Sequence, residues 1–199
     1  MEKFRIAYNN TLSHEGGYSY DPYDRGGETY KGIARKHWPQ WEGWAIVDAI
    51  KTKVRVEELN TLLQKNIGLQ GLVEQFYYEK FWMPVGGDDF NQDIANELFD
   101  TAVNQGRLMA GTYLQQALNK LNRNQQDYPD LITDGQIGFN TKHAYRLYMQ
   151  TARFSSRNHD KLIKWLLRWL NYYQLRKYDL ITNNDLTQER FVPGWTERV

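Results

Sequence analysis

The sequence predicts an all-α (mainly α) fold that carries one small β-hairpin. Apolar residues recur at steps of three or four, which is the spacing of one face of an α-helix. The segments with this spacing are Phe4 to Leu12, Val56 to Ile67, Phe90 to Ala102, Tyr113 to Leu121 and Leu162 to Tyr173. Strand is expected only in residues 18–34, where Gly26-Gly27 is flanked by extended, aromatic-rich stretches. We therefore expect about six to eight helices and one hairpin.

Size and charge narrow the class of protein. The chain has 199 residues, 41% of them hydrophobic, and a formal net charge of +1, which suits one domain or one domain with an appendage. The first 100 residues hold 11 basic and 16 acidic side chains, and the last 99 hold 14 and 8, so the C-terminal half is basic. No nucleic-acid-binding motif accompanies this bias, and we expect no nucleic-acid partner.

Clear breaks in the helical pattern occur at Pro84 with Gly86-Gly87 and between Pro129 and Gly138. Neither break has the composition of a flexible linker. Two regions packed together are therefore expected, rather than two beads on a string.

The stretch "SHEGGYSYDPYDRGGETYKGIA", residues 13–34, contains the first candidate catalytic group. The expected first helix ends at Glu15, and Gly16-Gly17 would close its last turn. A carboxyl group at a helix C-terminus has a raised pKa, because that end carries partial negative charge. A raised pKa is what a general acid needs at neutral pH. The alternative is that Glu15 is a solvent-facing residue at a frayed helix end.

A second carboxylate and a hydroxyl follow within the same stretch. Asp24 and Thr29 lie across the expected Gly26-Gly27 turn, so an acid, a carboxylate and a hydroxyl can converge on one cleft. Glycoside hydrolysis needs one protonated carboxyl for the leaving oxygen and one group to position water or stabilise positive charge. Asp24 could instead initiate a turn, and Thr29 could be an ordinary strand residue. Glu28 ranks below Asp24, because strand alternation sets it on the face opposite Thr29.

The pattern H-E-G-G-Y-x-x-D-P-x-D-x-G-G-x-T-x-x-G-I, which includes Glu15, resembles the signature of the glycoside hydrolase family 108 lysozymes. These N-acetylmuramidases are also described as secretion activators. The segments "FYYEKFWMPVGGDDF" (76–90) and "ELFDTAVNQG" (97–106) resemble later blocks of the family. The segment "DGQIGFNT" (134–141) resembles the D-G-x-x-G loop of its peptidoglycan-binding region. The resemblance thus spans most of the chain.

The resemblance implies a lysozyme-like fold that cleaves the β-1,4 bond between N-acetylmuramic acid and N-acetylglucosamine in peptidoglycan without a cofactor. Glu15 would be the catalytic acid, with Asp24 and Thr29 as partners. A catalytic region would cover residues 1–105, and a helical peptidoglycan-binding region would cover residues 106–199. Inversion would follow if Asp24 and Thr29 hold a water opposite Glu15, and retention if a carboxylate lies closer.

Aromatic residues are the first candidates for binding the sugar. Tyr18 and Tyr30 flank the expected site, and Trp38, Trp41 and Trp44 stand at three-residue intervals in a polar stretch. Exposed tryptophans stack on sugar rings, although core packing is their commoner role. Trp41 and Trp44 are kept as candidate sugar contacts.

Two amides near the end of the third segment are further candidates. Asn104 and Gln105 precede Gly106, and they could bind an acetamido group or simply form a polar helix end.

No metal site is expected. The four histidines lack the i, i+4 pairing of a helical zinc site. The loop at Asp134-Gly135 fails the ligand spacing of a calcium loop, so a turn before a helix starting near Asn140 is expected. The basic run at helical spacing is expected to be a solvated face; it consists of Arg153, Arg157, Lys161, Lys164 and Arg168.

Two rival functions share these features. One is a non-catalytic wall-binding or secretion accessory protein, and the other is a hydrolase of another amino sugar polymer such as chitin. We expect no membrane insertion, since no apolar run of spanning length is present. No Sec leader is recognisable, so the expectation is cytoplasmic synthesis and action on the wall after release by a holin or another non-Sec route. Phage lysis by an endolysin, secretion and wall remodelling are all compatible with it.

Overall fold

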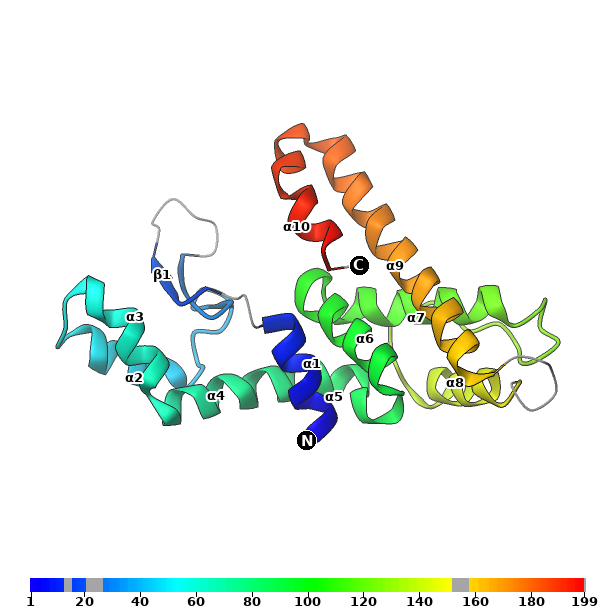
Figure 1. Cartoon of the computed structure of the whole chain (residues 1–199), viewed down its shortest axis with the longest axis horizontal. Helices are drawn as coiled ribbons and strands as arrows, with labels where there is room; N and C mark the ends of the chain where they lie inside the picture. Colours follow the sequence, from blue (N-terminus) through cyan, green and yellow to red (C-terminus); the bar gives the residue numbers. More distant parts are fainter. Residues whose placement is uncertain (13–15, 21–26, 152–157, 199) are drawn as a thin grey trace. The chain divides into compact units, whose positions relative to one another are not determined.

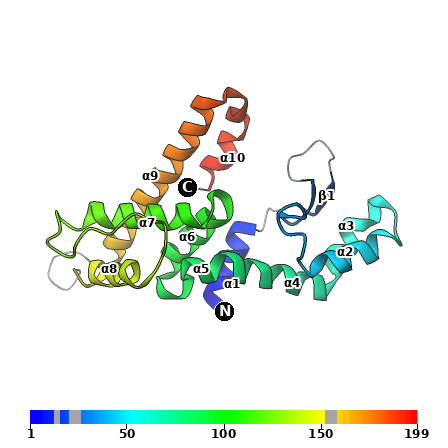
Figure 2. The ribbon, with the colours of Figure 1, turned by 180° about the vertical axis from the view of Figure 1, so that it is seen from behind.

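The computed structural model describes residues 1–12, 16–20, 27–151 and 158–198. These residues form two compact units. One unit is Tyr8–Lys80, and the other joins Met1–Ala7 to Phe81–Val199. Figures 1 and 2 show the ribbon from opposite sides. The mainly α fold with a small antiparallel sheet is confirmed. The predicted end of the first helix at Glu15 lies outside the described residues, which follow this helix, α1, over Glu2–Leu12.

The Tyr8–Lys80 unit combines a three-stranded sheet with three helices. Its elements are β1 (Tyr18–Tyr20), β2 (Glu28–Tyr30), β3 (Ile33–Ala34), α2 (Gly43–Lys51), α3 (Val56–Lys65) and α4 (Ile67–Tyr77). The strands are antiparallel in the order β1-β2-β3, with Tyr18 opposite Tyr30 and Tyr30 opposite Ile33. The buried core of this unit includes Tyr30, Ile33, Trp44, Val47, Leu63, Leu69 and Val73.

The second hairpin of the sheet was not expected from the sequence. Its two-residue turn is Lys31-Gly32, and both residues have positive φ, 43° and 77°. Such a turn matches the twist of the strands but is strained for a lysine. Lys31 is held in place by tertiary contacts: its ammonium donates to Gln70 Oε1 at 2.7 Å, and its carbonyl accepts from the Tyr77 hydroxyl at 2.8 Å.

The segment from Val56 to Ile67, expected as one helix, contains all of α3 and the first residue of α4. α3 ends at Lys65, and Asn66 caps the start of α4 by accepting the Leu69 N–H at 2.9 Å. Asparagine is a favoured N-cap, because its side-chain oxygen satisfies a backbone donor that the helix leaves unpaired. The apolar period alone did not reveal this break.

The other unit is a layered set of helices. Its elements after the π-helical turn η1 (Tyr78–Trp82) are α5 (Met83–Val85), η2 (Gly87–Asp89), α6 (Gln92–Gln105), α7 (Arg107–Leu121), α8 (Phe139–Gln150), α9 (His159–Asn184), η4 (Leu186–Phe191) and α10 (Val192–Thr196). α7 packs against α6, α8 and α9, and α10 folds back alongside α9 (Figures 1 and 2). The predicted break at Gly86 is present, with φ 65°.

An aromatic cluster forms part of the core of this unit. Phe4, Trp82 and Phe99 meet edge to face with ring centroids 5.7 to 6.0 Å apart, and all three are fully buried. Gly87 lies so close to Trp82 that a Cβ would approach the indole at 2.4 Å. The second glycine of the Gly86-Gly87 break is therefore required by packing.

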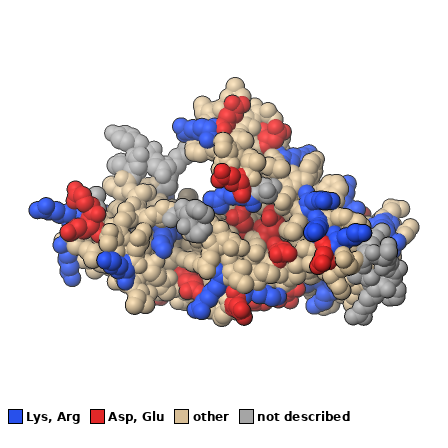
Figure 3. Space-filling model, viewed as in Figure 1, with Lys and Arg blue, Asp and Glu red and all other residues tan. Residues whose placement is uncertain are grey.

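Lys161, Lys164 and Arg168, the members of the predicted basic run that lie on α9, are exposed. Figure 3 shows blue side chains over the surface that α9 covers. This part of the predicted basic run is a solvated face, and Arg153 and Arg157 lie outside the described residues. Within the described ranges, no helix combines the length and apolar character needed to cross a membrane.

Candidate active site

The small sheet presents two chemically different faces. Successive strand residues point to opposite faces, so Tyr18, Glu28 and Tyr30 share one face, while Ser19 and Thr29, which are paired, share the other. The first face packs on the helices: Tyr30 is fully buried, and the Glu28 side chain is 10% exposed. Glu28 and Thr29 therefore lie on opposite faces, as strand alternation predicted.

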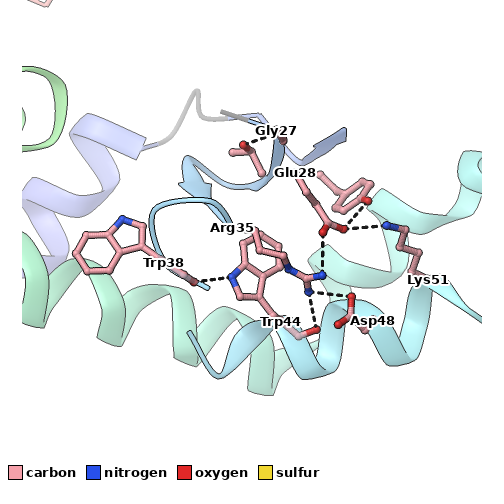
Figure 4. A network of polar contacts seen from close by, with 9 residues as sticks. Gly27, Glu28, Arg35, Trp38, Trp44, Asp48 and Lys51 are labelled. Carbon is pink, nitrogen blue, oxygen red and sulfur yellow. Dashed lines mark hydrogen bonds and ion pairs between the residues drawn. The ribbon is translucent and has the colours of Figure 1, made fainter. Parts of the chain in front are cut away.

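The Glu28 carboxylate is the centre of an ion-pair network (Figure 4). It accepts hydrogen bonds from the Tyr18 hydroxyl at 2.7 Å and from Lys51 Nζ at 2.9 Å. Arg35 Nη1 lies 2.9 Å from its second oxygen, and Arg35 Nη2 contacts Asp48 at 2.8 Å. Both oxygens of Glu28 are thus committed to partners within the fold.

These contacts keep Glu28 ionised. Burial raises its pKa, but hydrogen bonds from Lys51 and Tyr18 and the charge of Arg35 outweigh burial, and the net pKa lies below the usual value of a glutamate. A carboxyl group with a lowered pKa and two cationic partners cannot donate a proton at neutral pH. We conclude that Glu28 ties the sheet to α2 and does not act as the acid.

The backbone just after the H-E-G-G-Y glutamate is fixed by α3. Asn60 Oδ1 accepts the Tyr18 N–H at 2.5 Å, and Asn60 Nδ2 donates to the Tyr18 carbonyl at 3.3 Å. A Cβ on Gly17 would lie 2.2 Å from Asn60 Oδ1, so a larger residue there would displace the Asn60 side chain. The Gly17 carbonyl also accepts the Lys31 N–H at 3.2 Å. Asn60 is a positioning residue that the sequence did not single out, because its partners lie 42 positions away.

Of the three predicted catalytic residues, one is described. Thr29 is half-buried on the face opposite Glu28, and its hydroxyl donates weakly to the Gly27 carbonyl at 3.4 Å. Glu15 and Asp24 lie outside the described residues. The sheet therefore fixes the hydroxyl member of the predicted set, together with the chain segments that follow Glu15 and Asp24.

Two of the predicted aromatic sugar contacts serve the fold instead. Tyr30 has no exposed surface, and its hydroxyl accepts from Gln70 Nε2 at 2.9 Å. Trp44 is 4% exposed, donates to the Trp38 carbonyl at 2.9 Å and lies under the Arg35 guanidinium at 4.4 Å. Neither ring has a face open to a ligand in this structure. We place both in the core.

Tyr18 and Trp41 are partly exposed. Tyr18 uses its hydroxyl on Glu28 and lies beneath Lys51, whose ammonium is 5.2 Å from the ring. Trp41 stacks on Tyr30 at 6.5 Å and forms one wall of a groove of about 400 Å³. Trp38, Phe76, Glu42, Glu79 and Lys80 also line this groove. Aromatic walls with a charged rim are a suitable surface for a sugar ring.

Asn104 and Gln105 end α6 in the other unit, and Gly106 follows with φ 98°, as predicted. Asn104 is exposed, and its amide donates to the Asp100 carbonyl at 2.9 Å. Gln105 Oε1 accepts the Tyr113 hydroxyl at 2.9 Å, so this amide is engaged in the fold. Asn104 retains an accessible side chain, and Gln105 contributes to the packing of α6 on α7.

A half-buried acid on α6 was missed from the sequence. Burial, and then the negative charge of Asp100, raise the pKa of Glu97 to about 8, against a hydrogen bond from Thr101. Gln174 Nε2 on α9 donates to Glu97 Oε1 at 2.5 Å. Glu97 was not a candidate from the sequence, although it lies three residues after the buried Ile94. Among the described residues, no cluster of His, Asp and Glu could hold a metal ion.

Comparison with known proteins gives the family. Residues 8–106 match the sequence profile of Glycosyl hydrolase 108, and residues 109–199 match a profile described as Predicted Peptidoglycan domain. A comparison with curated proteins gives no match. Among solved structures, the chain is similar to Brucella abortus SagA, with 25% identity, a TM-score of 0.58, and coverage of 99% of this chain and 89% of that one. The chain belongs to the glycosyl hydrolase 108 family, and it is a peptidoglycan hydrolase with a C-terminal peptidoglycan domain.

Proposed function

We propose that this hydrolase cleaves the β-1,4 bond between N-acetylmuramic acid and N-acetylglucosamine, with Glu15 as general acid and Asp24 and Thr29 as its partners. The observation that carries the proposal is the two-faced sheet. The Glu28 carboxylate forms ion pairs with Arg35 and Lys51 on one face of the sheet, while Thr29 lies on the other face. This network argues against a catalytic role for Glu28. The other polar candidates are Glu15, Asp24 and Thr29, and they stay in the proposal.

In the proposed reaction, the Glu15 carboxyl gives its proton to the glycosidic oxygen as the C1–O bond of muramic acid breaks. The leaving N-acetylglucosamine thus gains a free 4-hydroxyl. Water adds to C1 and loses its proton to a carboxylate, which produces a new muramic acid reducing end. No cofactor enters this balance. Protonation of a poor leaving group is a step that a carboxylic acid performs well when its pKa is near the working pH.

Asp24 and Thr29 are proposed to act on the water or on the positive charge that develops at C1. The Thr29 hydroxyl has lone pairs that can accept a hydrogen bond from water, while its proton is directed to Gly27. A water held by Asp24 and Thr29 opposite Glu15 gives inversion, and direct attack by a closer carboxylate gives retention. The anomeric form of the first product distinguishes the two.

Sugar contacts are assigned to accessible side chains only. Trp41 and Trp38 line the 400 Å³ groove, where a pyranose ring can stack on indole. Asn104 is proposed to bind an acetamido group, since its side chain is exposed at the end of α6. Tyr18 keeps a positioning role through Glu28.

We also propose that the chain divides into a catalytic region and a wall-binding region. A catalytic region over 1–105 and a wall-binding region over 106–199 agree with profile matches that meet between residues 106 and 109. The compact units divide elsewhere, after Lys80, so α6 belongs to the catalytic region in sequence and to the second unit in packing. The enzyme would act at the cell wall, which fractionation of producing cells checks.

The test is product analysis on purified sacculi. Wild type should release new reducing ends that are muramic acid, and Glu15→Gln should release them at least a thousandfold more slowly while still binding the sacculi. Reducing ends of glucosamine would assign the enzyme to the other glycosidic bond. Binding without any release by wild type would support the accessory-protein alternative, and faster turnover of chitin than of sacculi would support the other polymer.

A further inference from the structure

The segment 122–138, between α7 and α8, has no regular secondary structure but is held firmly by side-chain amides of α7 and its C-cap. Gln115, Asn119 and Asn122 are spaced by four and three residues, so they share one face of α7. An irregular segment needs such partners, because its backbone groups have no ladder to pair with.

Each amide fixes a different part of the segment. Asn119 bonds both to the Leu131 N–H and to the Leu131 carbonyl, each at 2.8 Å. Gln115 Oε1 accepts the Gly135 N–H at 2.8 Å, while Gln115 Nε2 donates to Asp134 Oδ1 at 2.8 Å. Asn122 Nδ2 donates to Asp130 at 2.6 Å. The backbone and the two aspartates are thereby set in fixed positions.

Backbone contact between α7 and the segment is close as well. A Cβ on Gly111 would lie 1.9 Å from the Gly135 carbonyl oxygen, and Gly135 itself has φ 78°. Both positions therefore require glycine. Gly135, the first glycine of the D-G-x-x-G motif, thus packs its backbone directly against α7 at Gly111.

Large apolar side chains on this segment and at the start of α8 are exposed to solvent. Ile132 is 83% exposed and Phe139, the first residue of α8, is 74% exposed. His143, one turn further along α8, stacks parallel to Phe139 at 5.8 Å and supports one face of the ring. A fold that fixes exposed apolar groups with buried hydrogen bonds has the properties of a preorganised binding surface.

A groove of about 680 Å³ lies between the segment and α8, within the usual size range of ligand sites. Its polar lining includes the carboxylates and amides of Asp130, Asp134, Gln136 and Asn140, together with Tyr128, Thr141 and His143. Among the described residues that line it there is no lysine or arginine. Hydrogen bonds from Gln115 and from the Gln136 N–H hold the pKa of Asp134 below its usual value, so this carboxylate stays charged.

These features favour a neutral, hydroxyl-rich ligand. Carboxylates and amides pair with sugar hydroxyl and acetamido groups, and the supported phenyl ring of Phe139 can stack on a pyranose face. A stem peptide that carries its own carboxylates would meet two fixed aspartates and no lysine or arginine, which is unfavourable. The sugar backbone is therefore a better match than the peptide.

We propose that the groove between segment 129–138 and α8 binds the N-acetylated glycan backbone of peptidoglycan, with Phe139 and Ile132 as the central contacts. This inference rests on the proposed function only in taking peptidoglycan as the substrate. Its residues are separate from Glu15, Asp24 and Thr29, so binding here and cleavage can be lost independently.

The test uses the full chain as Glu15→Gln, so that the wall is not degraded, and measures its Kd for sacculi. Adding Phe139→Ala should raise Kd about five- to tenfold, because stacking on a sugar is lost. The matched control is Leu186→Ala, since Leu186 is 71% exposed in the same unit and does not line the groove. It should leave Kd unchanged, and both variants should unfold at the temperature of the parent.

Glycan strands stripped of stem peptides by an amidase identify the ligand. We expect them to bind as tightly as intact sacculi, with the same loss in Phe139→Ala. Loss of binding after peptide removal, competition by free stem peptides, or an unchanged Kd in Phe139→Ala would overturn the proposal. These outcomes are read without turnover, whereas failure of the catalytic proposal shows as undiminished cleavage by Glu15→Gln.

Discussion

Two glutamates in the two units show how the fold sets the charge of a carboxyl group. Glu28, on the sheet of the Tyr8–Lys80 unit, is surrounded by Lys51, Arg35 and Tyr18 and has a lowered pKa. Glu97, on α6 of the other unit, is half-buried beside an amide, a hydroxyl and Asp100, and its pKa is about 8. Burial acts on both, but only Glu28 has cations to oppose it.

The difference teaches which contacts a catalytic acid must lack. A glutamate with two cationic partners is a permanent anion and suits structure, whereas a carboxyl group without them can keep its proton at neutral pH. Glu97 has a raised pKa, but it is half-buried between α6 and α9 and accepts a hydrogen bond from Gln174.

The largest effect is expected from Glu97→Gln. The folded-state pKa of Glu97 is raised, so its contribution to stability is complete below about pH 4.5 and is lost as the pH rises to about 8. The loss is on the order of 4 kcal/mol. Glu97→Gln should remove this slope and be more stable than wild type at pH 9, as measured by denaturant unfolding across the pH range.

Other ionisable groups lie near Glu97, notably Asp100 on α6 and Tyr178 on α9. They are unchanged in the variant and serve as the internal reference. If Glu97→Gln kept the slope of wild type between pH 5 and pH 8, the contrast between the two glutamates would not hold.

Gly17→Ala tests the anchoring of the sheet by α3. A methyl group would collide with Asn60 and break both of its hydrogen bonds to Tyr18, at a cost of about 2 kcal/mol. Gly71→Ala is the control, because a Cβ there meets nothing within 4 Å inside α4 and should stabilise by about 0.5 kcal/mol. Thermal unfolding separates the two, and equal shifts would argue against close packing at Gly17.

Glu28→Gln removes the charge but keeps an oxygen for the Tyr18 hydroxyl. We expect a loss of about 1 kcal/mol, because Arg35 and Lys51 lose their shared partner at a partly exposed site. Because the folded-state pKa is lowered, wild type has this contribution above about pH 4.5 and loses it as the pH falls further. High salt should shrink the difference between the proteins. The exposed Glu57→Gln is the control and should change little.

The smallest effect is expected from Tyr18→Phe, which deletes one hydrogen bond to Glu28 and leaves both cations in place. The loss should be about 0.5 to 1 kcal/mol. Tyr20→Phe is the matched control on the same strand, since Tyr20 is 60% exposed and also lies under Lys51. Both variants keep the aromatic ring, so an equal or larger loss in Tyr20→Phe would contradict a stabilising hydrogen bond from the Tyr18 hydroxyl to Glu28.

Features that depend on local pattern were predictable from the sequence. Phe90, Ile94, Leu98 and Ala102 were expected on one helical face, and all four are buried. The hairpin and the helix near Asn140 also followed from turn residues and periodicity; α8 begins at Phe139.

What depends on distant partners was not predictable. Trp44 and Tyr30 were expected to face sugar, but Arg35 and Gln70 cover them from other elements. In the sequence, nothing distinguishes Asn60 from other polar residues of a helix, because its role depends on a hydrogen bond from Tyr18, which is distant in sequence. The tertiary fold, rather than residue type, decides whether an aromatic or amide side chain is free to bind a ligand.

The most direct measurement compares Glu15→Gln with Glu28→Gln in turnover of purified sacculi, with binding and thermal stability checked for both. We expect Glu15→Gln to bind but lose at least a thousandfold in rate, and Glu28→Gln to stay within about tenfold of wild type. Abolished turnover in a folded Glu28→Gln protein, with Glu15→Gln active, would contradict the assignment of the acid to Glu15 and of the structural role to Glu28.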